Sequence, residues 1–537
     1  MLVRMLVALV SGGLLAASFE PLTWWWVTPF CVAGLAVSVA GLTPRRAWWP
    51  ALVFAVAFYF PHIVWMRAVS TGAWLALAGI EALFYAALGP VLVVLMRHRA
   101  WPLWGAGAWA LAETVRSSWP FSGMPWGRLG FGVMDTPVAP ALAYVGATGV
   151  GFGLALASFC LAAALLRLRA GTRTTATGAR APATGPRAVV APLATVVVLV
   201  ALTGLAAVFP VRLAVSGQAT VAAVQPDVPG AGNDILAGFR EVTASTVRET
   251  VALAAAVDAG QVPRPDLVLW PENSTAVDPF ADAETNAGIR RASEAIGVPV
   301  VVGAIVDGGP GEVLNQGLVW EPGDRTAEDV TERYTKRHPV PYGEYIPARD
   351  LLEDLGVPIG NFGDLALIPR DMVAGERTTP LQVAGIAMAD AICFDVGYDD
   401  VLHDQVLGGA ELLAVQTSNA TFIATDQVDQ QFAITRARAV EAGRWLVVAS
   451  TNGITGVIAP DGSVVAEVPR RSTATLLEEV DLVEGVTPGV RVGRYAGWGA
   501  LALTAAGLAL GLRAGRRRVP GTMEEHDPTS PAPPHPS

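Results

Sequence analysis

The chain has 537 residues, of which 52% are hydrophobic and 16% charged, and its mean hydropathy is +0.44. Ordinary soluble domains carry about 25% charged residues, so this composition excludes a purely soluble protein and indicates a membrane part joined to at least one further domain. The net charge of −10 says little about partners, because the charged residues are segregated along the chain.

Long apolar runs dominate the N-terminal part of the chain, and one more lies near the C-terminus. A membrane-spanning helix needs about 20 apolar residues, and most of the runs are that long. The run at 101–115 is the shortest and carries Glu113 near its end. A second apolar run follows the first at once, which favours a span over a cleaved signal peptide. The runs occupy residues 2–19, 22–42, 48–66, 72–96, 101–115, 137–166, 188–209 and 495–514.

Arginine residues near the ends of these runs predict their orientation. With eight spans and a cytoplasmic N-terminus, most of these arginines fall on the cytoplasmic side, as the positive-inside rule requires. The expected localisation is the cell membrane, multi-pass, with both termini in the cytoplasm and residues 210–490 on the outer face. The arginine-rich connector 167–187 and the tail 519–537 are predicted to be disordered. The expected parts are a transmembrane bundle (1–209), an outer domain (210–490), a C-terminal transmembrane helix (491–514) and a disordered tail (515–537).

The segment 210–490 has a different pattern from the runs around it. Short β-rich runs alternate with stretches compatible with helices, which predicts an α/β domain with a layered sheet. The strand runs are nearly continuous in apolar residues, as expected for strands that are buried on both faces. The expected strands are TVAAVQP (220–226), DLVLWPE (266–272), PVVVGAI (299–305), VAGIAMADAICFD (383–395), ELLAVQTSN (411–419) and RWLVVAST (444–451), and the expected helices are 234–258, 285–296 and 425–442.

Cys393 is the candidate nucleophile, because Cys31 and Cys160 lie inside apolar runs. Its aspartate neighbours disfavour the reactive thiolate, so a cation must reach it from elsewhere in the chain. Glu272 and Cys393 both follow strands, and open α/β sheets place their sites at the carboxyl ends of strands. Between them, the segment RYTKRHPVPYGEYIP (333–347) is too rich in Pro and Gly for a helix, and it contains Lys336.

These residue types suit acyl transfer. Glu272 could take the thiol proton as a general base, and Lys336 could stabilise an oxyanion. A histidine is the usual partner of a catalytic thiol, and this segment offers His338 and His403 as alternatives. A Cys–His pair has no motif support in this sequence.

The stretches LWPE, YTKRHPVPYGEYIP and CFD, in this order, resemble the Glu–Lys–Cys triad of the nitrilase superfamily. With the apolar N-terminal part and the single C-terminal span, the chain resembles the apolipoprotein N-acyltransferase family from about residue 5 to residue 514. The segment FSGMPWGRLGF (121–131) is similar to that family's outer loop. The resemblance implies an α-helical membrane bundle of about eight helices with an extracytoplasmic nitrilase-like α-β-β-α sandwich.

The resemblance also implies roles for individual residues. Cys393 would be the nucleophile, Glu272 the general base and Lys336 the stabiliser of the tetrahedral intermediate. Glu344 is similar to a second acidic residue of the family that supports the lysine or the proton transfers.

Other residues near these motifs have less certain roles. Phe394 keeps the aromatic character that follows the cysteine in the family. Asp395 stands where the family commonly has Glu, which puts a hydrogen-bonding role at that position in doubt. Asn419 is either a turn residue or part of the pocket lining, and Trp119 and Trp126 are expected as anchors at the membrane interface.

The function that the resemblance implies is N-acylation in lipoprotein maturation. A fatty acyl chain would pass from a phospholipid, through a cysteine thioester, to the α-amine of the S-diacylglyceryl cysteine of an apolipoprotein. The expected partners are therefore a phospholipid donor, the diacylglyceryl-modified apolipoprotein and the membrane. The sequence indicates no cofactor, metal or nucleic acid, and a monomer is the simplest state.

Two alternatives stay open at this point. A membrane-tethered, nitrilase-like amidase would use the same residues with water as the acceptor, although a small soluble amide needs no multi-span scaffold. A non-catalytic membrane scaffold would leave the complete set of triad residues unexplained.

Overall fold

The structure is a computed structural model that describes residues 1–171, 187–356 and 368–516. Most of the predicted disordered connector and of the predicted C-terminal tail lies outside the described residues. The first residues of the connector, up to Gly171, continue a helix.

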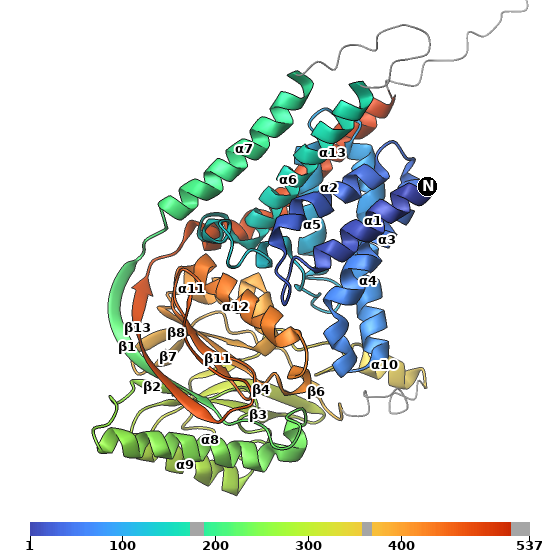
Figure 1. Cartoon of the computed structure of the whole chain (residues 1–537). Coiled ribbons are helices and arrows are strands. Elements are labelled where there is room, and N and C mark those ends of the chain that lie inside the picture. Colours follow the sequence, from blue (N-terminus) through green and yellow to red (C-terminus); the bar gives the residue numbers. More distant parts are fainter. Residues whose placement is uncertain (172–186, 357–367, 517–537) are drawn as a thin grey trace, which may run out of the picture.

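Each of the eight apolar runs forms a helix, and these helices gather in one bundle (Figure 1). By length and composition, four helices of the described chain could cross a membrane: α4, α6, α7 and α13. Helices α1 and α2 are shorter, so helix length alone does not establish the predicted count of about eight spans. The helices of the bundle are α1 (Leu2–Ala16), α2 (Thr28–Val39), α3 (Pro44–His62), α4 (Thr71–Leu95), α5 (Trp101–Arg116), α6 (Leu142–Gly171), α7 (Arg187–Val208) and α13 (Pro488–Arg516).

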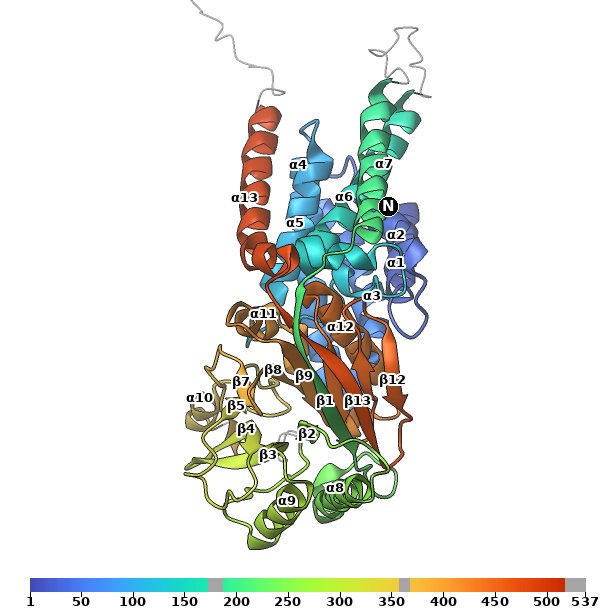
Figure 2. The ribbon, with the colours of Figure 1, turned by 90° about the vertical axis from the view of Figure 1, so that its left-hand side faces the viewer.

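Residues between α7 and α13 form two stacked β-sheets with helices on both outer faces (Figures 1 and 2). The first sheet has the order β13-β1-β2-β3-β4-β5, with β6 paired to β4, and the second has the order β12-β11-β10-β9-β8-β7. Strands β1, β2 and β3 are mutually parallel, and so are β8, β9 and β10. Helices α8 and α9 cover the first sheet, and α11 and α12 cover the second. This arrangement is the α-β-β-α sandwich that was predicted.

The central strands form because most of their residues are apolar and are buried on both faces. In β9, for example, all six residues of LLAVQT are buried. The strands are β1 (Ala214–Gln225), β2 (Leu267–Leu269), β3 (Val300–Gly309), β4 (Glu312–Trp320), β5 (Arg333–Thr335), β6 (Asp371–Met372), β7 (Leu381–Val383), β8 (Ile386–Ile392), β9 (Leu412–Thr417), β10 (Leu446–Ser450), β11 (Thr455–Ile458), β12 (Val464–Val468) and β13 (Ala474–Glu484). The helices are α8 (Ile235–Asp258), α9 (Ala283–Ile296), α10 (Arg349–Asp354), α11 (Asp399–Leu407) and α12 (Gln427–Ala442), and the short 3₁₀ helices used below are η7 (Cys393–Gly397) and η8 (Ala420–Phe422).

Helices α11 and α12 lie between the second sheet and the helix bundle (Figure 1). Helix α12 packs against α6, and α11 packs against α13. Because both faces of α12 are covered, even its charged residues Arg438 and Glu441 are buried. They pair with each other, and Glu441 Oε1 also accepts a hydrogen bond of 2.8 Å from the backbone N–H of Ala147 in α6. The sandwich is therefore joined to the bundle by buried polar contacts as well as by apolar packing.

Candidate active site

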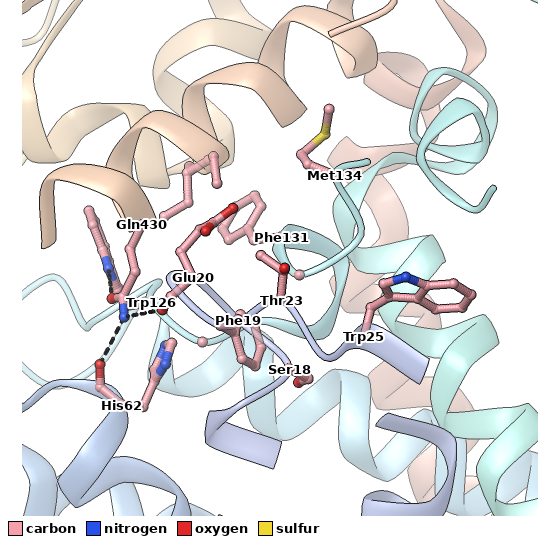
Figure 3. A pocket seen from close by; sticks show the side chains of 14 residues that line it. Ser18, Phe19, Glu20, Thr23, Trp25, His62, Trp126, Phe131, Met134 and Gln430 are labelled. Carbon is pink, nitrogen blue, oxygen red and sulfur yellow. Dashed lines mark hydrogen bonds between the residues drawn. The ribbon is translucent and has the colours of Figure 1, made fainter. Parts of the chain in front are cut away.

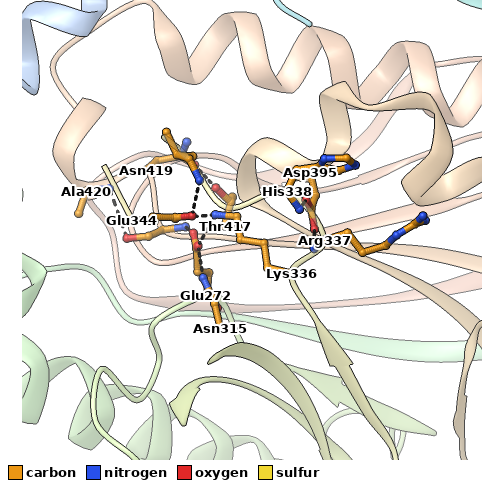
Figure 4. Close-up of polar contacts among 12 residues, drawn as sticks. Glu272, Asn315, Lys336, Arg337, His338, Glu344, Asp395, Thr417, Asn419 and Ala420 are labelled. Atoms are coloured by element: carbon orange, nitrogen blue, oxygen red, sulfur yellow. Dashed lines mark hydrogen bonds and ion pairs between the residues drawn. The ribbon is translucent and has the colours of Figure 1, made fainter. Parts of the chain in front are cut away.

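The three predicted triad residues follow three different strands. Glu272 comes three residues after β2, Lys336 directly follows β5, and Cys393 directly follows β8. Strands β2 and β5 belong to the first sheet and β8 to the second, so the site forms where strand ends of the two sheets meet. Figure 4 shows Glu272, Lys336 and Glu344 pointing toward one another in this region.

Lys336 is fully buried and lies between two carboxylates. Its Nζ atom is 2.6 Å from Glu344 Oε1 and 3.4 Å from Glu272 Oε1. Burial by itself would lower the pKa of Lys336, but Glu344 and Glu272 outweigh it and raise the pKa well above its ordinary value. The side chain therefore stays an ammonium group at neutral pH.

Glu272 is buried and held by neutral donors on both carboxylate oxygens. Asn315 Nδ2 donates to Oε1 over 2.8 Å, and the backbone N–H of Ser418 donates to Oε2 over 2.9 Å. The Thr451 hydroxyl bonds the Glu272 carbonyl oxygen. These contacts fix the carboxylate beside Lys336, as a positioned general base requires.

Cys393 is the first residue of η7 and has a left-handed backbone, with φ = 54°. Burial raises the pKa of the thiol to about 12. The Glu272 carboxylate raises it further, whereas Lys336 and a side-chain hydrogen bond with Thr417 act in the opposite direction. Glu272 and Lys336 therefore lie close enough to act on the thiol. At neutral pH the sulfur is protonated, so attack needs a base to remove its proton.

Glu344 lies in the loop after β5 and holds both the lysine and its own loop. One carboxylate oxygen pairs with Lys336, and the other accepts the backbone N–H of Val340 over 2.8 Å. Burial raises the pKa of Glu344, Lys336 lowers it and Glu272 raises it, with a net increase. Glu344 therefore contacts Lys336 directly, and its supporting role stays a prediction.

Asp395 connects the turn that carries Cys393 to the loop that carries Lys336. Its carboxylate is fully buried and accepts hydrogen bonds from the Tyr334 hydroxyl (2.8 Å) and from the backbone N–H groups of Arg337 (3.1 Å) and His338 (2.9 Å). The shorter acid does form hydrogen bonds at this position, while its equivalence to the family's Glu stays a prediction. Its carboxylate reaches three donors.

Phe394 rests on an aromatic residue of the helix bundle. Its ring stacks on Trp126, with centroids 4.7 Å apart and planes 3° apart. Trp126 is fully buried, so its expected role as an interfacial anchor was wrong, whereas Trp119 is 65% exposed. The indole of Trp126 packs inward because its N–H has a buried acceptor, Gln430.

Gln430, on α12, uses its whole amide group to join the sandwich to the bundle. Its Oε1 accepts the indole N–H groups of Trp65 (2.9 Å) and Trp126 (3.0 Å). Its Nε2 donates to the carbonyl oxygens of Glu20 (3.1 Å) and His62 (3.2 Å), and Figure 3 shows the contacts with Trp126, Glu20 and His62. This amide therefore fixes the tryptophan on which Phe394 stacks.

The remaining candidates have other partners. Asn419 has a left-handed backbone, and its buried side chain bonds Thr417, Ser450, Gln427 and Gln431, so it joins β9 to α12.

Both histidines have carboxylate partners. His338 contacts Asp400 at 3.0 Å, and His403 contacts Glu441 at 3.1 Å. The structure places no histidine contact at the Cys393 thiol among the described residues.

Comparisons with known proteins identify the family of the chain. A family model described as carbon–nitrogen hydrolase matches residues 220–486, and one described as the N-terminal domain of apolipoprotein N-acyltransferase matches residues 11–160. An apolipoprotein N-acyltransferase of Mycolicibacterium smegmatis is 34% identical over 91% of this chain and 82% of the relative. The chain belongs to the apolipoprotein N-acyltransferase family.

A second member of the apolipoprotein N-acyltransferase family, from Photobacterium profundum, is 24% identical over 92% of each chain. Among solved structures, a carbon–nitrogen hydrolase from Helicobacter pylori G27 is 16% identical and covers 53% of this chain and 94% of its own, with a TM-score of 0.35. Membership confirms the predicted acyltransferase class and the nitrilase-like fold of the sandwich.

Several residues of the site were not predicted from the sequence. Asn315 lies in β4, a strand that the sequence analysis missed, and Ser418 acts through its backbone. Tyr334 lies inside the quoted segment 333–347, where a buried aromatic hydroxyl could have been suspected. Gln430 belongs to a polar stretch of a predicted helix, QVDQQ, and no sequence signal separates it from an exposed glutamine.

Proposed function

We propose that this protein transfers a fatty acyl chain from a membrane phospholipid to the α-amine of the S-diacylglyceryl cysteine of an apolipoprotein. The observation that carries the proposal is the meeting of Glu272, Lys336 and Cys393 at the junction of the two sheets, within a chain of this family. The roles of these three residues, and those of Glu344, Phe394, Asp395 and Asn419, belong to the proposal.

In the first half-reaction, Cys393 Sγ attacks the carbonyl carbon of a phospholipid ester while Glu272 takes the thiol proton. The Lys336 ammonium group stabilises the negative oxygen of the tetrahedral intermediate. The carbon–oxygen bond then breaks, Glu272 returns the proton to the leaving oxygen, and a lysophospholipid departs. The acyl chain stays on Cys393 as a thioester.

In the second half-reaction, the α-amine of the acceptor cysteine attacks the thioester carbonyl carbon. Glu272 takes the proton from the attacking nitrogen, the carbon–sulfur bond breaks, and Glu272 returns that proton to Sγ, which restores the free thiol and the carboxylate. A thioester is converted to an amide, which is downhill, so the reaction needs no nucleotide. Glu344 keeps Lys336 charged and oriented in both halves.

The membrane arrangement is part of the proposal. We place eight spans in the cell membrane, both termini in the cytoplasm and the sandwich outside, with parts 1–209, 210–490, 491–514 and 515–537, and we take the protein as a monomer. The geometry supports this topology, because α7 and α13 run from the sandwich to the opposite end of the bundle (Figures 1 and 2). The Arg4 side chain also donates hydrogen bonds to the carbonyl oxygens of Ser38 and Ala40, so the start of α1 lies beside the end of α2.

Intact mass spectrometry after incubation with phospholipid tests the covalent step. We expect a hydroxylamine-labile acyl adduct on the wild-type protein and on a Cys160→Ser control, and none on Cys393→Ser. An equal adduct on Cys393→Ser would overturn the proposed nucleophile.

The match to the carbon–nitrogen hydrolase model supports a second candidate function, that of a membrane-tethered amidase with water as the acceptor. Comparing turnover on a diacylglyceryl-modified peptide with turnover on soluble amides separates the two. Faster release of free acid than of N-acylated peptide would favour the amidase.

A further inference from the structure

A cavity of about 540 Å³ lies between helices α5 and α13 and the residues at the end of η7, the turn that begins at Cys393. Its volume is in the range of small-molecule sites. The lining comes from the end of α5, the first turns of α13 and residues Gly397 to Asp400. None of the residues discussed above as part of the triad lines this cavity.

One side of the cavity is apolar and belongs to the helices. Leu111 on α5 and Trp498 and Leu501 on α13 line it. Trp498 is 73% exposed and Leu501 is 43% exposed, so this side continues into the outer surface of the bundle. These exposed apolar side chains offer a hydrocarbon chain a surface to pack on at the edge of the cavity.

The lining also includes hydroxyl groups and one arginine without a counterion in the described part of the chain. Ser117, Ser118 and Ser122 line the cavity, and the buried Ser117 hydroxyl has no hydrogen-bond partner. Arg494 on α13 also lines it, and no ion pair or hydrogen bond of its side chain occurs in residues 1–171, 187–356 and 368–516.

The two carboxylates that line the cavity are already neutralised. Asp399 is bound by Arg128 (2.7 Å) and Arg438 (2.8 Å). Asp400 is bound by Arg337 (3.0 Å) and by a histidine. The cavity lining is thus suited to a ligand that combines an anion with several acceptor oxygens and an acyl chain.

We propose that this cavity binds the phosphodiester headgroup of a membrane phospholipid, with the phosphate on Arg494 and the serine hydroxyls and an acyl chain against α5 and α13. Identifying that lipid as the acyl donor rests on the proposed function, because the apolipoprotein acceptor carries no phosphate. One lining residue links the cavity to the turn of Cys393. Tyr398 lines the cavity, and its ring contacts that of Phe394, the neighbour of Cys393, at a centroid distance of 5.8 Å.

Photo-crosslinking of the full chain in nanodiscs tests this site. The probe is a phosphatidylglycerol with a diazirine near the glycerol end of one acyl chain, and the protein carries Cys393→Ser so that no turnover occurs. We expect adducts on residues 111–118 and 494–501. Arg494→Gln should reduce them about tenfold, the effect of losing one charge-assisted hydrogen bond, and Arg494→Lys should restore most of them.

Arg491→Gln is the matched control, because Arg491 is exposed one turn earlier on α13 and does not line the cavity. Equal losses in Arg491→Gln and Arg494→Gln, or no loss in either, would overturn the site. Displacement of the probe by equimolar soluble glycerophosphoglycerol would overturn the lipid assignment in favour of a free phosphodiester. Because crosslinking needs no thioester, adducts here without an acyl-enzyme on the wild-type protein would contradict the proposed function alone.

Discussion

The Lys336 ammonium group lies 2.6 Å from the Glu344 carboxylate, closer than its 3.4 Å separation from Glu272. Glu344 is therefore the main counterion of the lysine, and Glu272 keeps its second oxygen on the Ser418 N–H. Glu344 therefore holds the lysine, whereas Glu272 is the group proposed to move the proton.

Glu344→Gln should slow acyl-enzyme formation without abolishing it. The neutral amide can still accept a hydrogen bond from Lys336, but it no longer compensates the buried charge, so the pKa of Lys336 falls toward its ordinary value. We expect a rate loss of about 10- to 100-fold, within the range for one electrostatic contributor, measured by timed intact mass spectrometry. Glu353→Gln, a nearby exposed acid on α10, should react at the wild-type rate, and a wild-type rate in Glu344→Gln would contradict the supporting role.

Glu272→Gln should have opposite effects on acyl transfer and on simple alkylation. Transfer should stop, because the proton acceptor is lost. Removing the carboxylate also removes a negative charge that raises the pKa of the Cys393 thiol, so more thiolate forms at a given pH. A fall of about one pKa unit gives about tenfold more thiolate, and iodoacetamide labelling at pH 8 should accelerate accordingly.

In the wild-type protein the same labelling should rise steadily with pH up to about 10 without a plateau, because the thiol pKa is raised to about 12. Cys393→Ser supplies the background from Cys31 and Cys160. A plateau near pH 7 would mean a preformed thiolate and would contradict the need for a base.

Asp395→Asn should destabilise the site more than Tyr334→Phe does. The carboxylate accepts two backbone N–H groups and one hydroxyl in a buried position, and an amide cannot accept on both of its heteroatoms. We expect a loss of about 2 kcal/mol for Asp395→Asn and about 1 kcal/mol for Tyr334→Phe, measured by thermal unfolding in detergent. Equal stability of the two variants would show that the backbone contacts contribute little.

Asp390 should make the stability of the protein fall as pH rises. Its carboxyl is fully buried, neither oxygen has a hydrogen bond of good geometry, and burial and Asp395 raise its pKa to about 8. In the native state Asp390 therefore keeps a proton that it loses near pH 4 in the unfolded chain. The contribution of Asp390 to the stability of the protein is fully present below pH 4 and is lost progressively up to about pH 8.

Asp390→Asn should remove this dependence. Asp390 Oδ2 and Gln416 Oε1 both face Gly317, because a methyl group built on that glycine would lie 2.3 Å from the first oxygen and 2.6 Å from the second. An amide at position 390 therefore has the Gln416 oxygen nearby as an acceptor. Unfolding temperatures at pH 5 and pH 8 should differ less in the variant than in the wild-type protein. An unchanged difference would mean that Asp390 is not the responsible group.

The sequence by itself determined the helices of the bundle, the central parallel strands and the candidate triad. Apolar runs predicted the helices of the bundle, and continuous apolar stretches predicted β1, β2, β3, β8, β9 and β10, because buried segments must be apolar whatever their neighbours are. Glu272, Lys336 and Cys393 were found because each sits in a short stretch that resembles a family motif. Strands β4 to β7 and β11 to β13 were missed. Strands β5, β7, β12 and β13 lie at sheet edges and β6 has only two residues, whereas β4 and β11 lie inside the sheets but interrupt their apolar residues with polar ones and glycine.

Only the tertiary structure decided which groups contact one another. Asp395 reaches the loop of Lys336 because β8 of one sheet ends opposite β5 of the other, and the stacking of the two sheets brings together residues about 60 positions apart. Trp126 is buried rather than interfacial because Gln430, some 300 residues later, supplies its acceptor. Such contacts depend on how helices and sheets pack, and the local pattern of a sequence carries the polarity of a residue but not the identity of its partner.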